Sequence, residues 1–148
     1  MVTIHTDHKE LTTEEFNTLK SKCLAAKDLS YSPYSNFRVG CTLITESGTY
    51  ISGANIENAS YGACICAERT TISKALLEGH KKLKVIAISS DDKDPISPCG
   101  ICRQFIREFG VDIPIYMFGN SGQFIKVYLE DLLPLSFGPE NLGKPSIG

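Results

Sequence analysis

Hydrophobic residues recur along the chain at two spacings, one typical of helices and one typical of strands. Thr12 and Glu15 form a capping box, so we expect a helix to begin there. The apolar positions that follow are three or four residues apart, as on one face of a helix: Phe16, Leu19, Cys23 and Ala26. Two later helices are predicted, from about 66 to 78 and from about 99 to 110. Short apolar runs predict strands at 37–44, 49–51, 83–88, 113–118 and 124–129.

The order of these elements predicts one α/β domain. Helix, two strands, helix, strand, helix and two strands fit a single three-layer domain, with a mixed sheet of about five strands flanked by helices. The two strand–helix–strand steps are expected to place their strands side by side. We expect residues 1–11 to be a polar N-terminal tail, frayed over residues 1–10, and 12–148 to be the domain, with a C-terminal tail at 134–148.

Composition narrows the class of protein. The chain has 148 residues, of which 42% are hydrophobic and 22% are charged, as in globular domains. A net charge of −2 argues against a protein that grips a phosphate backbone. The sequence shows no apolar leader and no stretch of about 18 apolar residues, so we expect the protein in the cytoplasm, with the nucleus as a further location. In such reducing compartments, the clustered members of its six cysteines indicate metal binding or catalysis.

Three cysteines lie at the starts of the two later helices. Cys66 precedes one helix, while Cys99 and Cys102 lie at the start of the other. A helix N-terminus carries a partial positive charge, which favours the thiolate form that binds metal. Cys99 and Cys102 are three residues apart and can point at one ion. Three thiolates on Zn²⁺ leave one tetrahedral position open, as in a catalytic rather than a structural zinc site.

Two charged residues follow Cys66 directly. Glu68, in the first helical turn, can reach a water on the open metal position without ligating the metal. Arg69 and the two helix N-termini are expected to offset the excess negative charge of three thiolates around a divalent ion. That offset matters because an electron-rich zinc is a weaker Lewis acid.

The other three cysteines have alternative interpretations. Cys23 and Cys41 occupy apolar positions of a predicted helix and strand, so we expect buried core thiols. Cys64 forms a C-x-C pair with Cys66 and leaves open a closed, four-cysteine structural site. A redox function of the C-x-x-C pair at 99–102 is a weaker alternative.

These motifs resemble one known family. Cys66-Ala67-Glu68 with Pro98-Cys99-Gly100-Ile101-Cys102 is similar to the zinc-binding pattern of the cytidine deaminases. The resemblance extends over about residues 12–141 and includes the segments 32–40, 55–61 and 136–140. It points to the small, homotetrameric branch that acts on free nucleosides and works in pyrimidine salvage.

The resemblance implies a role for each matching residue. One Zn²⁺ per chain would be held by Cys66, Cys99 and Cys102, and Glu68 would be the catalytic proton shuttle. Phe37 would stack on the pyrimidine, Asn55 and Glu57 would hold the ribose hydroxyls, and the Ala67 backbone would bind the base. Further pocket residues, some of them from neighbouring subunits, would be Ala59, Tyr61 and Phe137.

The function expected on these grounds is zinc-dependent hydrolytic deamination of cytidine and deoxycytidine to uridine and deoxyuridine, with release of ammonia. A nucleic-acid deaminase is disfavoured, because such enzymes need a basic channel and Glu57 would repel phosphate. We therefore expect a small-molecule nucleoside as the partner, with neither nucleic acid nor membrane. A zinc-stabilised interaction module and a deaminase of cytosine-bearing antibiotics remain as alternatives.

Overall fold

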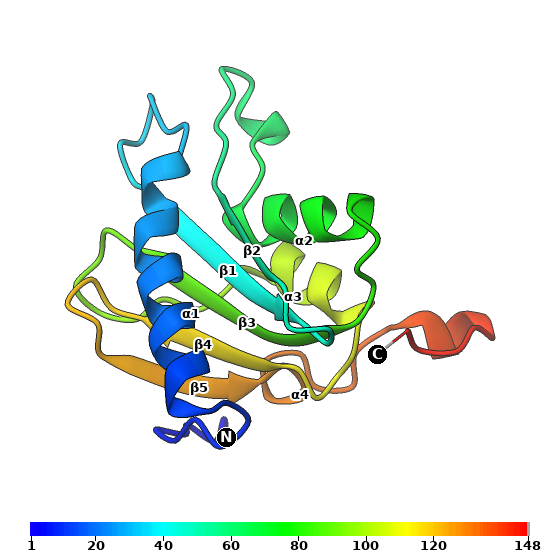
Figure 1. Cartoon of the computed structure of the whole chain (residues 1–148). Coiled ribbons are helices and arrows are strands. Elements are labelled where there is room, and N and C mark those ends of the chain that lie inside the picture. Colours follow the sequence, from blue (N-terminus) through cyan, green and yellow to red (C-terminus); the bar gives the residue numbers. More distant parts are fainter. Residues whose placement is uncertain (148) are drawn as a thin grey trace.

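The computed structural model describes residues 1–147 and contains the predicted elements in the predicted order (Figure 1). The helices are α1 (Thr13–Ala26), α2 (Ala67–Leu77), α3 (Gly100–Arg107) and α4 (Leu129–Leu132). The strands are β1 (Val39–Thr45), β2 (Tyr50–Ala54), β3 (Leu83–Ser90), β4 (Pro114–Phe118) and β5 (Phe124–Tyr128). Short 3-10 turns cover Lys27–Leu29, Tyr61–Ala63 and Pro139–Leu142. Within residues 1–147, no helix is both long and apolar enough to cross a membrane.

The five strands form one mixed sheet in the order β2-β1-β3-β4-β5. β3 and β4, which α3 connects, lie side by side as predicted and pair in parallel. The other neighbouring strands pair antiparallel. The expectation that β2 and β3 lie side by side is wrong, because β1 lies between them. β1 pairs with β2 on one edge through the hairpin and with β3 on the other, so the α2 connection passes over one strand.

The sheet has a separate apolar core on each face. α1 covers one face and α2 and α3 cover the other (Figure 1). Alternate residues of a strand point to opposite faces, and the two cores follow that alternation. Leu43, Ile86 and Ile88 belong to the core under α2 and α3, whereas Ile44 and Val85 belong to the core under α1. The three-layer α/β architecture is therefore confirmed.

The start of α1 and the position of α2 each depend on one identifiable feature of the sequence. The capping box is present as predicted: the Glu15 N–H donates to Thr12 Oγ1 at 3.1 Å, and the Thr12 N–H donates to Glu15 Oε1 at 2.9 Å. α2 lies very close to β2, since a Cβ atom on Gly53 would lie 2.5 Å from Thr71 Oγ1. Because residue 53 is glycine, α2 can pack in direct contact with β2.

The start of the chain is held against β5, so the expectation that it is frayed is wrong for residues 5–10. His5 and Lys126 exchange two backbone hydrogen bonds of 2.8 Å. The fully buried Lys126 ammonium donates to Asp7 at 2.8 Å and to both carboxylate oxygens of Glu10 at 3.0 Å. The Tyr116 and Tyr128 hydroxyls also donate to Glu10.

This polar cluster predicts a pH-dependent stability. Burial alone would raise the pKa of Glu10, but the hydrogen bonds from Tyr128, Tyr116 and Lys126 outweigh it and lower the pKa to about 2. A carboxylate with a lowered folded-state pKa stabilises the fold above its ordinary pKa of about 4, and that stabilisation is lost as the pH falls towards 2. We expect Glu10→Gln to destabilise the protein by about 3 kcal/mol at pH 7, because it removes a partner of a buried charge.

Urea denaturation at several pH values measures this effect. The difference between wild type and Glu10→Gln should be largest at pH 7 and should shrink between pH 4 and pH 2. Glu14→Gln, at an exposed carboxylate in the first turn of α1, is the matched control and should leave the free energy of unfolding within about 0.5 kcal/mol. A pH-independent difference between wild type and Glu10→Gln would contradict the assignment.

Candidate metal centre and active site

Three cysteine sulfur atoms gather at one point of the structure. The Sγ atoms of Cys66, Cys99 and Cys102 all lie within 4.8 Å of one another, and those of Cys66 and Cys99 are 3.8 Å apart. A Zn–S bond of about 2.3 Å in a tetrahedral site places two sulfur ligands about 3.8 Å apart. The sulfur triangle therefore fits a zinc ion with three thiolate ligands and one open position.

Two helix N-termini create this triangle. Cys66 is the N-cap residue of α2, Cys99 is the N-cap residue of α3, and Cys102 follows in the first turn of α3. Neither N-cap side chain caps its own helix. Both thiols are therefore left for another ligand, in the partial positive charge of the helix ends.

The protonation of the thiols reflects their mutual contact. The hydrogen bond with Cys102, together with those from the Arg69 guanidinium and Cys99, lowers the pKa of Cys66 to about 5 against the effect of burial. The same hydrogen bond, together with burial, raises the pKa of Cys102. Zinc binds the thiolate form of cysteine, so metal binding would displace the protons that these thiols share.

Glu68 and Arg69 lie where the sequence predicts. Glu68 is 4% exposed, and burial raises the pKa of its carboxyl group, which is within hydrogen-bonding reach of Cys102. The Arg69 guanidinium donates to Cys66 Sγ at 3.8 Å and to the carbonyl oxygen of Cys64 at 3.4 Å. A buried carboxyl group and a cation thus lie on two sides of the sulfur triangle.

The remaining cysteines separate from the cluster. All six cysteines are free, and Cys23 and Cys41 are fully buried core thiols, as predicted. The Cys64 Sγ lies 3.3 Å from the backbone nitrogen of Asn58, which donates to it, and among residues 1–147 it is not a member of the ligand cluster. The geometry thus favours the open site over the four-cysteine alternative.

The loop at 55–61 lies between the metal centre and the loop at 30–37. Ile56 pairs with Tyr31 on one side and with Ile65, directly before Cys66, on the other. In Figure 1 these two loops rise together from the same end of the sheet, beyond the start of α2. The predicted nucleoside contacts Asn55 and Glu57 are in this way connected to the cysteine cluster.

Asn55 and Glu57 also hold the loops in shape. The Asn55 side chain accepts from the Val39 N–H at 3.0 Å and donates to the Phe37 carbonyl at 3.0 Å. Glu57 accepts from the Ser35 hydroxyl and from the N–H groups of Tyr34 and Ser35 at 2.9 and 3.1 Å. The hydrogen bond from the Ser35 hydroxyl, followed by those from the backbone, lowers the pKa of Glu57 and keeps it ionised.

A small hollow of about 270 Å³ lies beside these groups. It is lined by Tyr34, Ser35, Glu57, Tyr61 and Cys64. Tyr34, Ser35 and Cys64 were not among the predicted site residues. The run of Ser, Pro, Tyr and Asn at 32–36 indicates a turn, but a turn composition does not reveal that its backbone binds a carboxylate 22 and 23 residues later.

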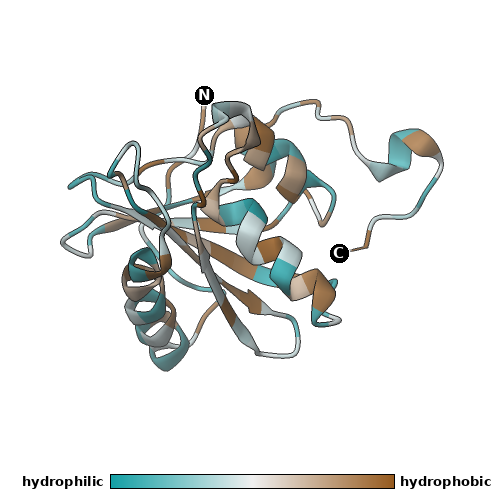
Figure 2. Cartoon of the chain, turned by 90° about the horizontal axis from the view of Figure 1, so that it is seen from above, coloured by the Kyte–Doolittle hydropathy of each residue, from teal (hydrophilic) through white to brown (hydrophobic). Residues whose placement is uncertain are grey.

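Most of the other predicted site residues lie on the loops or at the start of α2, and Phe137 lies apart from them. Phe37, Ala59 and Tyr61 are exposed on the two loops, and Ala67 is buried at the first position of α2. Phe37 is 38% exposed, so it is not a core residue. Phe137 is instead on the C-terminal segment, which extends away from the body of the domain (Figure 2). Within one chain, Phe137 therefore does not line the hollow beside Glu57.

Residues 13–118 match the family model described as the cytidine and deoxycytidylate deaminase zinc-binding region. The chain belongs to this family. The cytidine deaminase of Halalkalibacterium halodurans is 41% identical over 125 residues, which cover 84% of this chain and 95% of that protein. A probable cytidine deaminase of Dictyostelium discoideum is 44% identical over 82% of this chain and 85% of its own length.

Solved structures agree with the family assignment. The crystal structure of cytidine deaminase from Burkholderia pseudomallei superimposes with a TM-score of 0.80 at 38% identity, covering 86% of this chain and all of that chain. The family model describes a zinc-binding region, and the sulfur triangle has the geometry that zinc requires. The family's cofactor, one Zn²⁺ per chain, is thus supported by both the comparison and the donor atoms.

Proposed function

We propose that the protein catalyses the zinc-dependent hydrolytic deamination of cytidine and deoxycytidine to uridine and deoxyuridine. One observation carries the proposal: three cysteine sulfur atoms form a triangle with zinc geometry, and a buried carboxyl group lies beside it. A structural zinc site needs no buried acid at its edge, whereas hydrolysis of an amine needs a group that moves protons.

The chemistry divides between the metal and the chain. Zinc bound by Cys66, Cys99 and Cys102 supplies the Lewis acidity that makes water a nucleophile near neutral pH. Glu68 takes a proton from the water and delivers it to N3 of the cytosine ring as the water oxygen bonds to C4. Glu68 then takes the remaining proton from the new C4 hydroxyl and gives it to the exocyclic amine, so the C–N bond breaks, ammonia leaves and a C4 carbonyl remains.

Charge balance and orientation come from the surrounding residues. Arg69 offsets the negative charge of the thiolates through its contact with Cys66. The first N–H groups of α2, starting at Ala67, have no acceptor within the helix and are available to the base. Phe37 stacks on the pyrimidine ring, while Ala59 and Tyr61 complete the wall of the pocket.

The ribose is assigned to Asn55 and Glu57. The Asn55 amide group has a second N–H beyond the one that binds the Phe37 carbonyl. Glu57 is held ionised and accepts three hydrogen bonds from the chain, which leaves one lone-pair position for a sugar hydroxyl. The same negative charge repels a phosphate group, and none of the residues that line the hollow is cationic.

These charges predict the substrate preference. We expect kcat/KM for cytidine to exceed that for its 5′-monophosphate and for single-stranded DNA by about 100-fold or more, because a phosphate near Glu57 meets a like charge without a compensating cation. The loss of ultraviolet absorbance on deamination measures all three substrates. Preference for a phosphate-bearing substrate would reject the free-nucleoside assignment.

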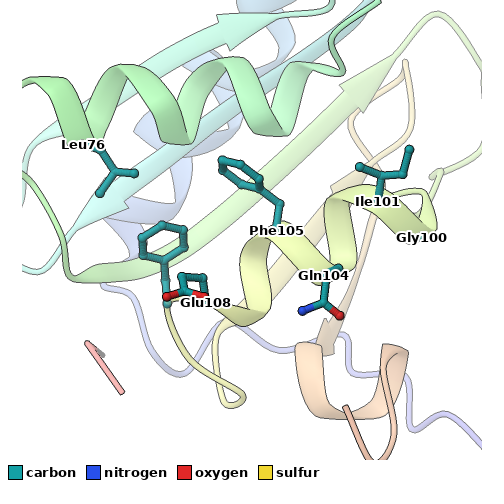
Figure 3. A pocket seen from close by; sticks show the side chains of 7 residues that line it. Leu76, Gly100, Ile101, Gln104, Phe105 and Glu108 are labelled. Atoms are coloured by element: carbon teal, nitrogen blue, oxygen red, sulfur yellow. The ribbon is translucent and has the colours of Figure 1, made fainter. Parts of the chain in front are cut away.

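We further propose that residues 12–148 work as one catalytic unit in a homotetramer with pockets shared between subunits. An apolar groove of about 760 Å³ between α2 and α3 supports assembly, and Leu76, Ile101 and Phe105 lie along it (Figure 3). Ile101 in this groove is 65% exposed, as on a surface that another subunit covers. Six free cysteines suit the reducing cytoplasm, where we place the enzyme in pyrimidine salvage.

A further inference from the structure

Residues Ser136–Glu140 wrap around the end of α3, and we refer to them as the arch. Their centre is Arg107, the last residue of α3, which is only 7% exposed. Arg107 Nε donates to Ser136 Oγ at 2.8 Å, and its Nη2 donates to Glu140 Oε2 at 2.8 Å. One guanidinium therefore holds both ends of the arch.

The middle of the arch touches the same guanidinium. A Cβ atom on Gly138 would lie 2.3 Å from the Arg107 Cζ atom, so a larger residue there would push the guanidinium out of its place. One turn earlier on α3, Gln104 Nε2 donates to the Phe137 carbonyl at 3.0 Å. The backbone on both sides of the Phe137 side chain is thus fixed to one face of α3.

Phe137 itself is not fixed into the core. It is 56% exposed, whereas the two residues that follow it are buried. The Arg107 side chain is buried while that of its partner Glu140 is 48% exposed, so the pair adds little net stability but fixes the position of the arch. A buried guanidinium that holds an exposed aromatic ring in one position is therefore suited to presenting that ring to a binding surface.

Within one chain, the Phe137 ring and the hollow beside Glu57 are separate. The hollow beside Phe137 and the hollow beside Glu57 share none of their lining residues. Figure 1 shows the C-terminal segment leaving the domain well away from the loops that carry Phe37 and Tyr61. A second copy of the chain, which has an open nucleoside hollow of its own, is a partner of matching chemistry.

We propose that Arg107 is a positioning residue that holds the arch and so presents Phe137 to the nucleoside pocket of a second copy. The inference rests on the proposed function through the role of Phe137. α3 begins at the zinc ligand Cys99 and ends at Arg107, so one rigid helix connects the metal centre of its own chain to the pocket of the next.

A double-mutant cycle tests whether Arg107 acts through Phe137. We expect Arg107→Ala and Phe137→Ala each to raise KM for cytidine by about 10-fold or more, with a smaller change in kcat, because a displaced aromatic ring weakens substrate binding. The double variant should be no worse than Phe137→Ala alone. Losses that multiply in the double variant would overturn the inference.

Two further variants separate positioning from loss of stability. Ile106→Val removes a methyl group from a buried residue next to Arg107, so it should lower Tm while leaving KM unchanged. Arg107→Lys keeps the charge but has one donor group in place of the fork, so it should recover part of the KM change. If Ile106→Val raises KM as much as Arg107→Ala does, the effect is one of stability and the inference fails.

Mixed assemblies test whether the arch acts across chains. Arg107→Ala chains retain Glu68, and Glu68→Ala chains retain the arch. Mixed assemblies of the two variants are purified by a different tag on each chain. In these assemblies, an active pocket of an Arg107→Ala chain can receive the intact arch of a Glu68→Ala chain. We expect such pockets to show the wild-type KM. A KM unchanged from that of Arg107→Ala would show that the arch acts within its own chain and would overturn the inference. Absence of cytidine turnover in the wild type would instead reject the proposed function.

Discussion

Replacing Glu68 with alanine should abolish most cytidine turnover while leaving zinc bound and the chain folded. Glu68 is 4% exposed in the first turn of α2 and lies beside the thiol cluster, but it is not one of the three sulfur ligands. General acid–base catalysis by one positioned group contributes about 10²- to 10⁴-fold, and here the same carboxyl group serves two successive proton transfers. We therefore expect kcat to fall by at least about 10³-fold.

Three measurements on the same preparation make the test decisive. These are the rate of absorbance change with cytidine, the zinc content per chain and the far-ultraviolet circular dichroism. Glu78→Ala, at the exposed C-terminal end of the same helix, is the matched control and should turn over cytidine like the wild type. Near wild-type turnover by Glu68→Ala would eliminate the proton-shuttle role, and loss of zinc in that variant would assign Glu68 to the metal instead.

The metal centre was predictable from the sequence because its information is local. Each thiol lies within a few residues of a helix start, and helix starts have recognisable signals. The spacing of Cys99 and Cys102 already places both side chains on one side of a helical turn. A single long-range step, the meeting of two helix N-termini, completes the site, and the sheet order provides it.

Other parts of the molecule depend on contacts that no local pattern encodes. Lys126 alternates with apolar residues in its strand and has the composition of a solvent-facing position, yet it is fully buried against residues about 120 positions earlier in the chain. The position of β1 between β2 and β3 likewise depends on which strand pairs with the free edge of β1, and that pairing is a long-range contact. The arch depends on Arg107, whose charge alone gives no indication of burial.

The site residues on loops were predictable in part: the sequence indicates their identity, but not their contacts. Glu57 is found by resemblance, but the sequence does not show that the backbone N–H groups of Tyr34 and Ser35 and the Ser35 hydroxyl fill three of its four lone-pair positions. That occupancy bears on the proposed role of Glu57, because a carboxylate so fixed would favour one sugar orientation over others.

Cys102→Ala should lose zinc and activity together while the domain remains folded. Cys102 is fully buried and is one of the three sulfur atoms of the triangle, so its removal leaves two ligands, too few for a tightly held zinc ion. The two apolar cores under α1 and under α2 and α3 do not depend on the metal for their contacts. We expect zinc content below about 0.1 per chain and kcat/KM reduced by at least 10³-fold, with an unchanged circular dichroism spectrum.

Cys64→Ala is the matched control, because Cys64 is two residues from the ligand Cys66 but its thiol is outside the cluster. It should retain one zinc per chain, and loss of zinc in this variant would restore the four-cysteine site. Unfolding of Cys102→Ala, or of the wild type on chelation, would mean that the metal supports the fold, as in an interaction module. If the chain remains folded while it loses turnover, the zinc acts in catalysis and not in folding, because the two apolar cores hold the domain together without it.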